Sequence, residues 1–221
     1  MTSLALYYAS GACSFVPHVL LENSGAAFEP HAVKLHKGEQ KSPEYLAINP
    51  RGQVPVLVQD GQVLTQIVAI VLHLDQLFPG VAGLPTEPMA RSQALSRLAW
   101  MNNTVHPTFT HIFKPQAFTD STEAQASVRA HNLTVFRGLL AEIQGMVQAA
   151  QASGQAWLGS ERIGALDAYA LTFTRWGSMV GIRPDAHPDL WAHVQRVAAH
   201  PAVARVIERE RLQLDMSPRT A

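Results

Sequence analysis

Apolar residues follow two different patterns along the chain, and the first pattern covers about eighty residues. Short apolar runs that predict strands lie at residues 4–8, 28–35, 56–59 and 62–64. Helices are predicted at residues 14–23, from the Ser-Pro-Glu cap at 42–44, and at residues 67–78. The pair Asp60-Gly61 favours a hairpin turn between the last two strands. The order is therefore βαβαββα, a parallel unit followed by an antiparallel hairpin.

The rest of the chain has helical spacing only. Helices are predicted at residues 89–103, 122–151, 165–180, 190–199 and 202–212. Residues 79–88 contain three prolines and two glycines, which is typical of a linker. We therefore expect an α/β domain at residues 1–80, a linker at 81–88 and an all-helical domain at 89–221.

Composition narrows the choice of partners. Seventeen basic residues balance seventeen acidic ones, so we expect neither nucleic acid nor a membrane surface as a partner. The N-terminus lacks a signal-peptide pattern, and no apolar run approaches the ~20 residues that span a bilayer. A single cysteine excludes an internal disulfide and fits a reducing compartment, and the ten histidines show no metal-ligand spacing. These features predict a cytoplasmic protein without a metal.

The one cysteine lies at a chemically useful place. Cys13 follows the first strand and precedes the first helix, in the stretch Gly11-Ala12-Cys13-Ser14. The positive end of a helix dipole lowers the pKa of a thiol, so this position favours a thiolate. Ser14 is expected to cap the helix or to donate a hydrogen bond to the sulfur. The alternative is a small buried cysteine beside an ordinary cap, since Val16 stands where a Cys-x-x-Cys pair needs its second thiol.

A proline at a strand entrance is the second unusual feature. Pro55 follows the turn at residues 49–52 and opens the strand at 56–59. Proline lacks the N–H that a ladder needs, so it belongs at strand starts or edges. A cis bond here would turn the backbone N–H and C=O of Val54 outward, toward a ligand with a peptide backbone. An ordinary trans turn proline is the alternative.

Three other side chains are candidates with weaker support. Tyr8 ends the first strand, and because neighbouring strand residues face opposite sides, either it or Tyr7 can point to a site. His106 lies where Pro107 interrupts a helix, and a half-exposed histidine at a bend is the alternative. Asp167, three residues after Gly164, is interpreted as a structural helix cap.

Several of these stretches occur together in one known family. Residues 8–14, 49–55, 64–65, 69–70 and 167–169 follow the order seen in cytosolic glutathione transferases, and the chain resembles the bacterial beta class from end to end. The resemblance implies a thioredoxin-like N-terminal domain, an all-helical C-terminal domain and a homodimer. It also implies glutathione as cosubstrate and a hydrophobic electrophile as second substrate.

The resemblance assigns roles to individual residues. It implies that Pro55 is cis, that the Val54 backbone pairs with the cysteinyl part of glutathione, and that Gln53 contacts one end of the tripeptide. Cys13 would meet the glutathione sulfur. His106 corresponds to a histidine near the substrate. Further glutathione contacts are implied, with less support, for Lys37 and Asn102.

Two positions depart from the family pattern. An acidic residue and then Ser or Gly hold the γ-glutamyl group in beta-class relatives, whereas this chain has Gln66 and Ile67. Gln66 keeps an acceptor without the charge, and Ile67 has no hydroxyl. One lost charge-assisted hydrogen bond, worth ~1.5–3 kcal/mol, weakens binding about ten- to a hundredfold. Pro107 also stands where a lysine often follows the histidine.

These observations leave a leading hypothesis and its alternatives. The leading one is a glutathione transferase that activates the glutathione thiol, with thiol transfer or peroxide reduction as a close variant. Cys13, Ser14 and Tyr8 are the candidates near the sulfur. Alternatively, the altered pair Gln66 and Ile67 indicates a transferase-fold binding module, or an enzyme with a different cosubstrate. Aromatic residues at 109, 113 and 118 suit an apolar ligand or a core.

Overall fold

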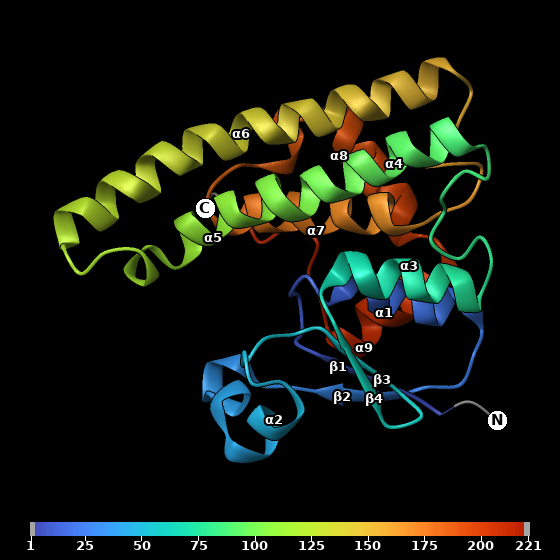
Figure 1. The fold of residues 1–221 in the computed structure, drawn as a ribbon. Coiled ribbons are helices and arrows are strands. Elements are labelled where there is room, and N and C mark those ends of the chain that lie inside the picture. Colours follow the sequence, from blue (N-terminus) through green and yellow to red (C-terminus); the bar gives the residue numbers. More distant parts are fainter. Residues whose placement is uncertain (1–2, 219–221) are drawn as a thin grey trace.

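A computed structural model describes residues 3–218, and a four-stranded sheet forms the centre of its N-terminal part (Figure 1). The strands are β1 (Leu4–Tyr8), β2 (Glu29–Ala32), β3 (Val56–Gln59) and β4 (Gln62–Thr65). Their order in the sheet is β2-β1-β3-β4, with β1 parallel to β2 and antiparallel to β3. The predicted mixed, thioredoxin-like sheet is therefore confirmed.

Helices pack on both faces of this sheet. The helices α1 (Phe15–Ser24) and α3 (Ile67–Leu77) pack on one face, while α2 (Pro43–Ile48) lies towards the other (Figure 1). Alternate residues of β1 are buried, and Tyr8 belongs to the main core on the α1 side. Tyr7 belongs to a smaller cluster on the α2 side with Tyr45. As predicted, Ser42 caps α2, accepting a hydrogen bond from the Tyr45 N–H at 3.2 Å.

The second strand is shorter than the sequence pattern indicates. A strand was expected at residues 28–35, but β2 ends at Ala32. The chain then forms two 3-10 turns, Leu35–Lys37 and Glu39–Lys41, on either side of Gly38. Gly38 has a φ of 75°, a left-handed conformation that glycine adopts without steric cost.

Six helices make up the remainder of the described chain, and five of them lie together above the N-terminal unit in Figure 1. They are α4 (Pro88–Trp100), α5 (His106–Phe113), α6 (Thr122–Ala152), α7 (Ala165–Met179), α8 (Pro188–Ala198) and α9 (Pro201–Glu210). The sixth, α9, returns to pack beside α1. The last helix of the chain is thus part of the surroundings of the first.

The first helix of this part continues further than residue 103, where the prediction ended it. A π-helical turn, Met101–Val105, joins α4 to α5 without a break. The His106 N–H donates to the Met101 carbonyl, one residue further back than in an α-helix. Pro107 has no N–H to give, so the helix lacks one backbone hydrogen bond there, and the π-helical turn lies directly before it.

Asp167 has the structural role that the sequence predicts, with a further partner. One of its oxygens accepts a hydrogen bond from the Gly164 N–H at 2.9 Å, which forms the capping box at the start of α7. The other accepts from the Leu158 N–H and lies 2.9 Å from Nε2 of His193. This buried carboxylate therefore joins α7, α8 and the loop between α6 and α7.

Candidate active site

Cys13 lies at the start of α1, with its sulfur directed toward the entrance of β3. The thiol donates to the carbonyl oxygen of Val54, with 3.7 Å between Sγ and oxygen. The Val54-Pro55 peptide bond is cis, as the resemblance implies. The backbone N–H of Val54 has no hydrogen-bond partner among residues 3–218. A cysteine and a free backbone donor thus lie side by side.

The state of the Cys13 thiol differs from the prediction made for a helix N-terminus. Burial raises its pKa to about 12, although the backbone N–H groups of Cys13 and Ser14 act in the opposite direction. Only 8% of the residue is exposed, so the cost of placing a charge there outweighs the helix-end effect. The expected lowering of the pKa is therefore wrong, and Cys13 is a thiol near pH 7.

Ser14 holds the loop before the cysteine. Its hydroxyl accepts from the Ala9 N–H at 3.0 Å and lies 3.2 Å from the Ala9 carbonyl, to which it donates. The side chain is fully buried and forms no cap hydrogen bond. Both of its interactions are therefore directed to the end of β1, rather than to α1 or the sulfur.

The segment that carries Val54 is fixed from behind. The backbone carbonyl of Gln53 accepts two hydrogen bonds, from the Tyr45 hydroxyl at 2.8 Å and from the Asn49 amide at 2.7 Å. Both donors are buried, whereas the Gln53 side chain is exposed. The backbone direction at Gln53-Val54 is therefore set by α2 and the turn after it.

Tyr169 and Asn102 lie on the helical side of the cysteine. Tyr169 is completely buried, and its hydroxyl donates to Oδ1 of Asn102 at 2.9 Å. Burial raises the pKa of Tyr169 well above its usual value, and the nearby Cys13 raises it further. Asn102, expected to contact glutathione, is a half-buried residue of the π-helical turn.

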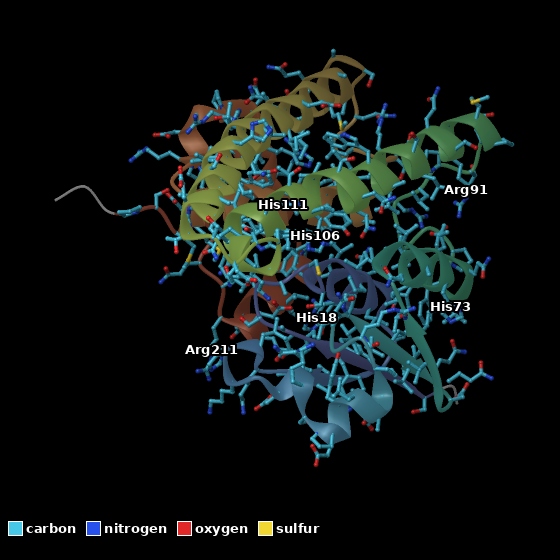
Figure 2. The ribbon with its side chains drawn as sticks, turned by 60° about the vertical axis from the view of Figure 1, so that its left-hand side comes forward. His18, His73, Arg91, His106, His111 and Arg211 are labelled. Atoms are coloured by element: carbon cyan, nitrogen blue, oxygen red, sulfur yellow. The ribbon has the colours of Figure 1, made fainter. Side chains whose placement is uncertain are left out.

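His106 contacts Trp176, and Trp176 in turn contacts the loop that leads to Cys13. Figure 2 shows it where the helical part meets the N-terminal unit. Its ring is 5.1 Å from that of Trp176, centroid to centroid, and the Trp176 indole N–H donates to the Gly11 carbonyl at 2.8 Å. Burial lowers the pKa of His106 to about 4, so the ring is neutral near pH 7.

Glu210, at the end of α9, reaches the same loop and was not identified from the sequence. One carboxylate oxygen accepts from the Gly11 N–H at 2.8 Å, and the other lies 2.7 Å from Nδ1 of His18. The Ser10 hydroxyl also donates to the Glu210 backbone carbonyl. These contacts join positions about 200 residues apart, so no local pattern indicates them.

The two departures from the family pattern lie at the start of α3. Gln66 is exposed and has a φ of 74°, and its side chain does not cap the helix. Ile67 is 4% exposed and belongs to the main core. The Ile67 side chain is therefore directed to the core. Where beta-class relatives have Ser or Gly, this chain has an apolar side chain that packs in the core.

Two further candidates, Tyr8 and Lys37, form no hydrogen bond with Cys13 or Val54 within residues 3–218. Tyr8 packs its ring 4.5 Å from that of His18, and burial together with the charge of Glu210 raises its pKa. No hydrogen bond of the described residues joins Tyr8 to Cys13. Lys37 is exposed on the first 3-10 turn.

Residues 3–218 include no helix long and apolar enough to cross a bilayer. Within the same residues, no three His, Cys, Asp or Glu side chains converge as a metal site requires. A thioredoxin-like unit joined to helices, with a cysteine beside a cis-proline, matches the architecture that the sequence resemblance implies.

Comparisons with known proteins agree with this architecture. The family model described as "Glutathione S-transferase, N-terminal domain" matches residues 2–76. Glutathione S-transferase GstA of Escherichia coli O157:H7 is 30% identical over 213 residues, which covers 95% of this chain and 100% of the relative. The chain belongs to the glutathione S-transferase family.

Solved structures of family members are similar along almost the whole chain. The glutathione S-transferase from Xylella fastidiosa is 29% identical with a TM-score of 0.84, covering 95% of this chain and 100% of its own. A sphingomonad glutathione S-transferase, solved in complex with glutathione, is also 29% identical. Its TM-score is 0.72, with the same coverage of both chains.

Proposed function

We propose that this chain is a glutathione transferase that holds glutathione against Val54 and Cys13 and directs its sulfur at an apolar electrophile. Family membership and the glutathione complex of a related structure support this function. The observation that carries it is the pairing of the Cys13 thiol with the Val54 carbonyl, beside a Val54 N–H that has no partner. That arrangement presents one donor, one acceptor and one thiol to a cysteinyl peptide.

The raised pKa of Cys13 defines its part in the chemistry. A group with a pKa of about 12 stays protonated near pH 7, so its S–H is a hydrogen-bond donor. Rotation of the thiol from Val54 toward a bound sulfur would give that sulfur a charge-assisted hydrogen bond. We expect this bond to favour the glutathione thiolate over the thiol, and thereby its attack on the electrophile.

The electrophile is proposed to lie on the helical side. Phe109 stacks on Trp176 at 4.5 Å between ring centroids, and Trp176 is bonded to the loop before Cys13. Phe113 stacks on Phe109, and 52% of its surface is exposed. Together with the neutral His106, these rings favour an uncharged aromatic or alkyl electrophile over a charged one.

The finer points of the proposal rest on the residue pattern. The stretch Gly11-Ala12-Cys13-Ser14 and the histidine at 106 support a beta-class enzyme. We propose a homodimer, a cytoplasmic location and a role in detoxification by the same resemblance. The intact pairing of Cys13 with Val54 supports an enzyme over a binding module. Thiol transfer through Cys13 should be slow near pH 7, because it needs a Cys13 thiolate.

The test is conjugation of glutathione to 1-chloro-2,4-dinitrobenzene by the purified full chain. We expect turnover above the solution reaction, and a kcat/KM about ten- to a hundredfold lower in Cys13→Ala, which loses one charge-assisted hydrogen bond. Cys13→Ser keeps a donor and should retain most of the activity. Equal activity in Cys13→Ala, or no turnover by the native chain, would contradict the proposal.

A further inference from the structure

A pocket lies at the opposite end of α1 from Cys13. Its volume is about 600 Å³, within the usual range for small-molecule sites. The ends of α1 and α3, the loop before α7 and the start of α9 line it, and they contribute Asn23, Phe78, Trp157, Arg162, Ile163 and His200. Since α1 has ten residues that rise about 1.5 Å each, the pocket lies roughly 15 Å from the cysteine.

One side of this pocket is apolar and held in place. Trp157 and Phe78 are half-buried, and Ile163 is buried in the main core. The Trp157 ring meets His193 and His200 edge to face, each at 6.2 Å between centroids. The Arg196 guanidinium lies 5.8 Å from the centre of the same ring. The indole is therefore a fixed surface against which a flat apolar group can stack.

The polar groups of the pocket are mainly donors without partners. The side chains of Asn23, Arg162 and His200 form no hydrogen bond or ion pair within residues 3–218. Nδ1 of His200 is buried. Arg162 is exposed and Asn23 is half-buried, so both side chains are free to bind a ligand, whereas a buried nitrogen such as Nδ1 of His200 normally has a partner. Glu161 also lines the pocket, but it is exposed and forms no ion pair with the neighbouring Arg162.

The position of Arg162 and the local charge both favour an anion. A Cβ atom at Gly80 would lie 2.9 Å from a terminal nitrogen of Arg162, so glycine leaves the room that the guanidinium occupies. Burial and then the charge of Arg205 lower the pKa of His200, which indicates a positive potential at this end of the pocket. Glu22 is paired with both Arg205 and Arg209.

We propose that this pocket is a second, non-catalytic binding site for a small aromatic carboxylate. The flat ring would stack on Trp157 and Phe78, and the carboxylate would accept hydrogen bonds from Arg162 and Asn23. A neutral ligand of the same shape would leave these donors unpaired on binding, which lowers its affinity. The site shares no lining residue with the surroundings of Cys13, so glutathione and the carboxylate bind independently.

Calorimetric titration of the full chain with 2-naphthoate tests the site. We expect one saturable site per chain, binding about tenfold weaker for 2-naphthamide, and binding about tenfold weaker to Arg162→Gln. Arg129→Gln is the matched control, because Arg129 is exposed on α6 and forms no ion pair in the described part of the chain. A repeat with S-hexylglutathione present should give the same affinity.

Each arm has an outcome that overturns the proposal. Absence of saturable binding would show that the site does not exist. Equal affinity for 2-naphthamide would show that the site does not select an anion. An unchanged affinity in Arg162→Gln would place the ligand elsewhere. Loss of binding when S-hexylglutathione is present would place it in the catalytic site. The Arg162 arm does not depend on glutathione binding, so it decides the question even if the proposed function fails.

Discussion

At the residue scale, Cys13 is governed by its burial more than by its position in the sequence. A helix N-terminus lowers the pKa of a thiol, but the structure leaves only 8% of this residue exposed, and its pKa rises to about 12. The position of Cys13 before the first helix could be predicted from the sequence, because it depends on neighbouring residues. The burial of Cys13 depends on contacts between β3, α1 and α7, which neighbouring residues do not specify.

The thiol should therefore react slowly with an alkylating agent. We expect the rate of iodoacetamide labelling to increase with pH up to pH 10 without a plateau, because the thiolate fraction still rises there. Mass spectrometry of the intact chain measures the rate, since Cys13 is the single thiol. A plateau with a midpoint near pH 7 would show a stabilised thiolate instead.

His106 should make the stability of the fold sensitive to acid. Its pKa is about 4 in the folded chain and 6.5 when free, so protonation favours the unfolded state. The full contribution is present above pH 6.5 and falls as the pH approaches 4. At pH 4.5 we expect a loss of roughly 1–3 kcal/mol from this residue.

Urea unfolding of the native chain and His106→Asn at pH 7 and pH 4.5 isolates that contribution. The difference in unfolding free energy between the two pH values should be smaller in the variant. If both proteins lose the same stability on acidification, His106 titrates normally and the account of its burial is wrong.

At the element scale, most helix and strand positions could be predicted from periodicity. The hairpin, the capped start of α2 and the long helix α6 lie close to where their patterns place them. The π-helical turn before His106 could not be predicted. Pro107 signals a break, whereas the burial of Met101 and Val105 in the core favours a continuous helix.

The start of α3 combines a proposed ligand-binding position, Gln66, with core packing by Ile67. Ile67 is buried, so Ile67→Ser would leave a cavity and a hydroxyl in the core. We expect a loss of about 2–5 kcal/mol in unfolding free energy, measured by urea unfolding. Val63→Ser on β4 is the control, because Val63 is 48% exposed and the change should cost less than about 0.5 kcal/mol. Equal effects would mean that Ile67 is not a core residue.

At the scale of the whole molecule, the end of the chain supports the loop before Cys13. Glu210 of α9 joins Gly11 and His18, and Arg209 donates to the other nitrogen of His18 at 3.0 Å. The Asp167 box and the position of Cys13 were evident from neighbouring residues. The role of Glu210 depends on contacts across almost the full length of the chain. The domain boundaries at 1–80, 81–88 and 89–221 remain a prediction.

Glu210→Gln should destabilise the fold and weaken catalysis together. The amide places an N–H₂ group against either the Gly11 N–H or the His18 ring, so one buried donor loses its acceptor. We expect a loss of about 2–4 kcal/mol in unfolding free energy and a lower kcat/KM. Glu208→Gln, an exposed position on the same helix, should change neither. Similar results for both variants would contradict the proposed support.

The central claim is that glutathione binds beside Cys13 although Gln66 carries no charge. The most direct measurement is calorimetric titration of reduced glutathione into the native chain, with Gln66→Glu and the exposed control Gln62→Glu alongside. We predict one site per chain with an affinity between micromolar and low millimolar. Gln66→Glu should bind about fivefold more tightly, because it restores a charge-assisted hydrogen bond worth roughly 1 kcal/mol more, and Gln62→Glu should not. No binding to any of the three proteins would contradict the account.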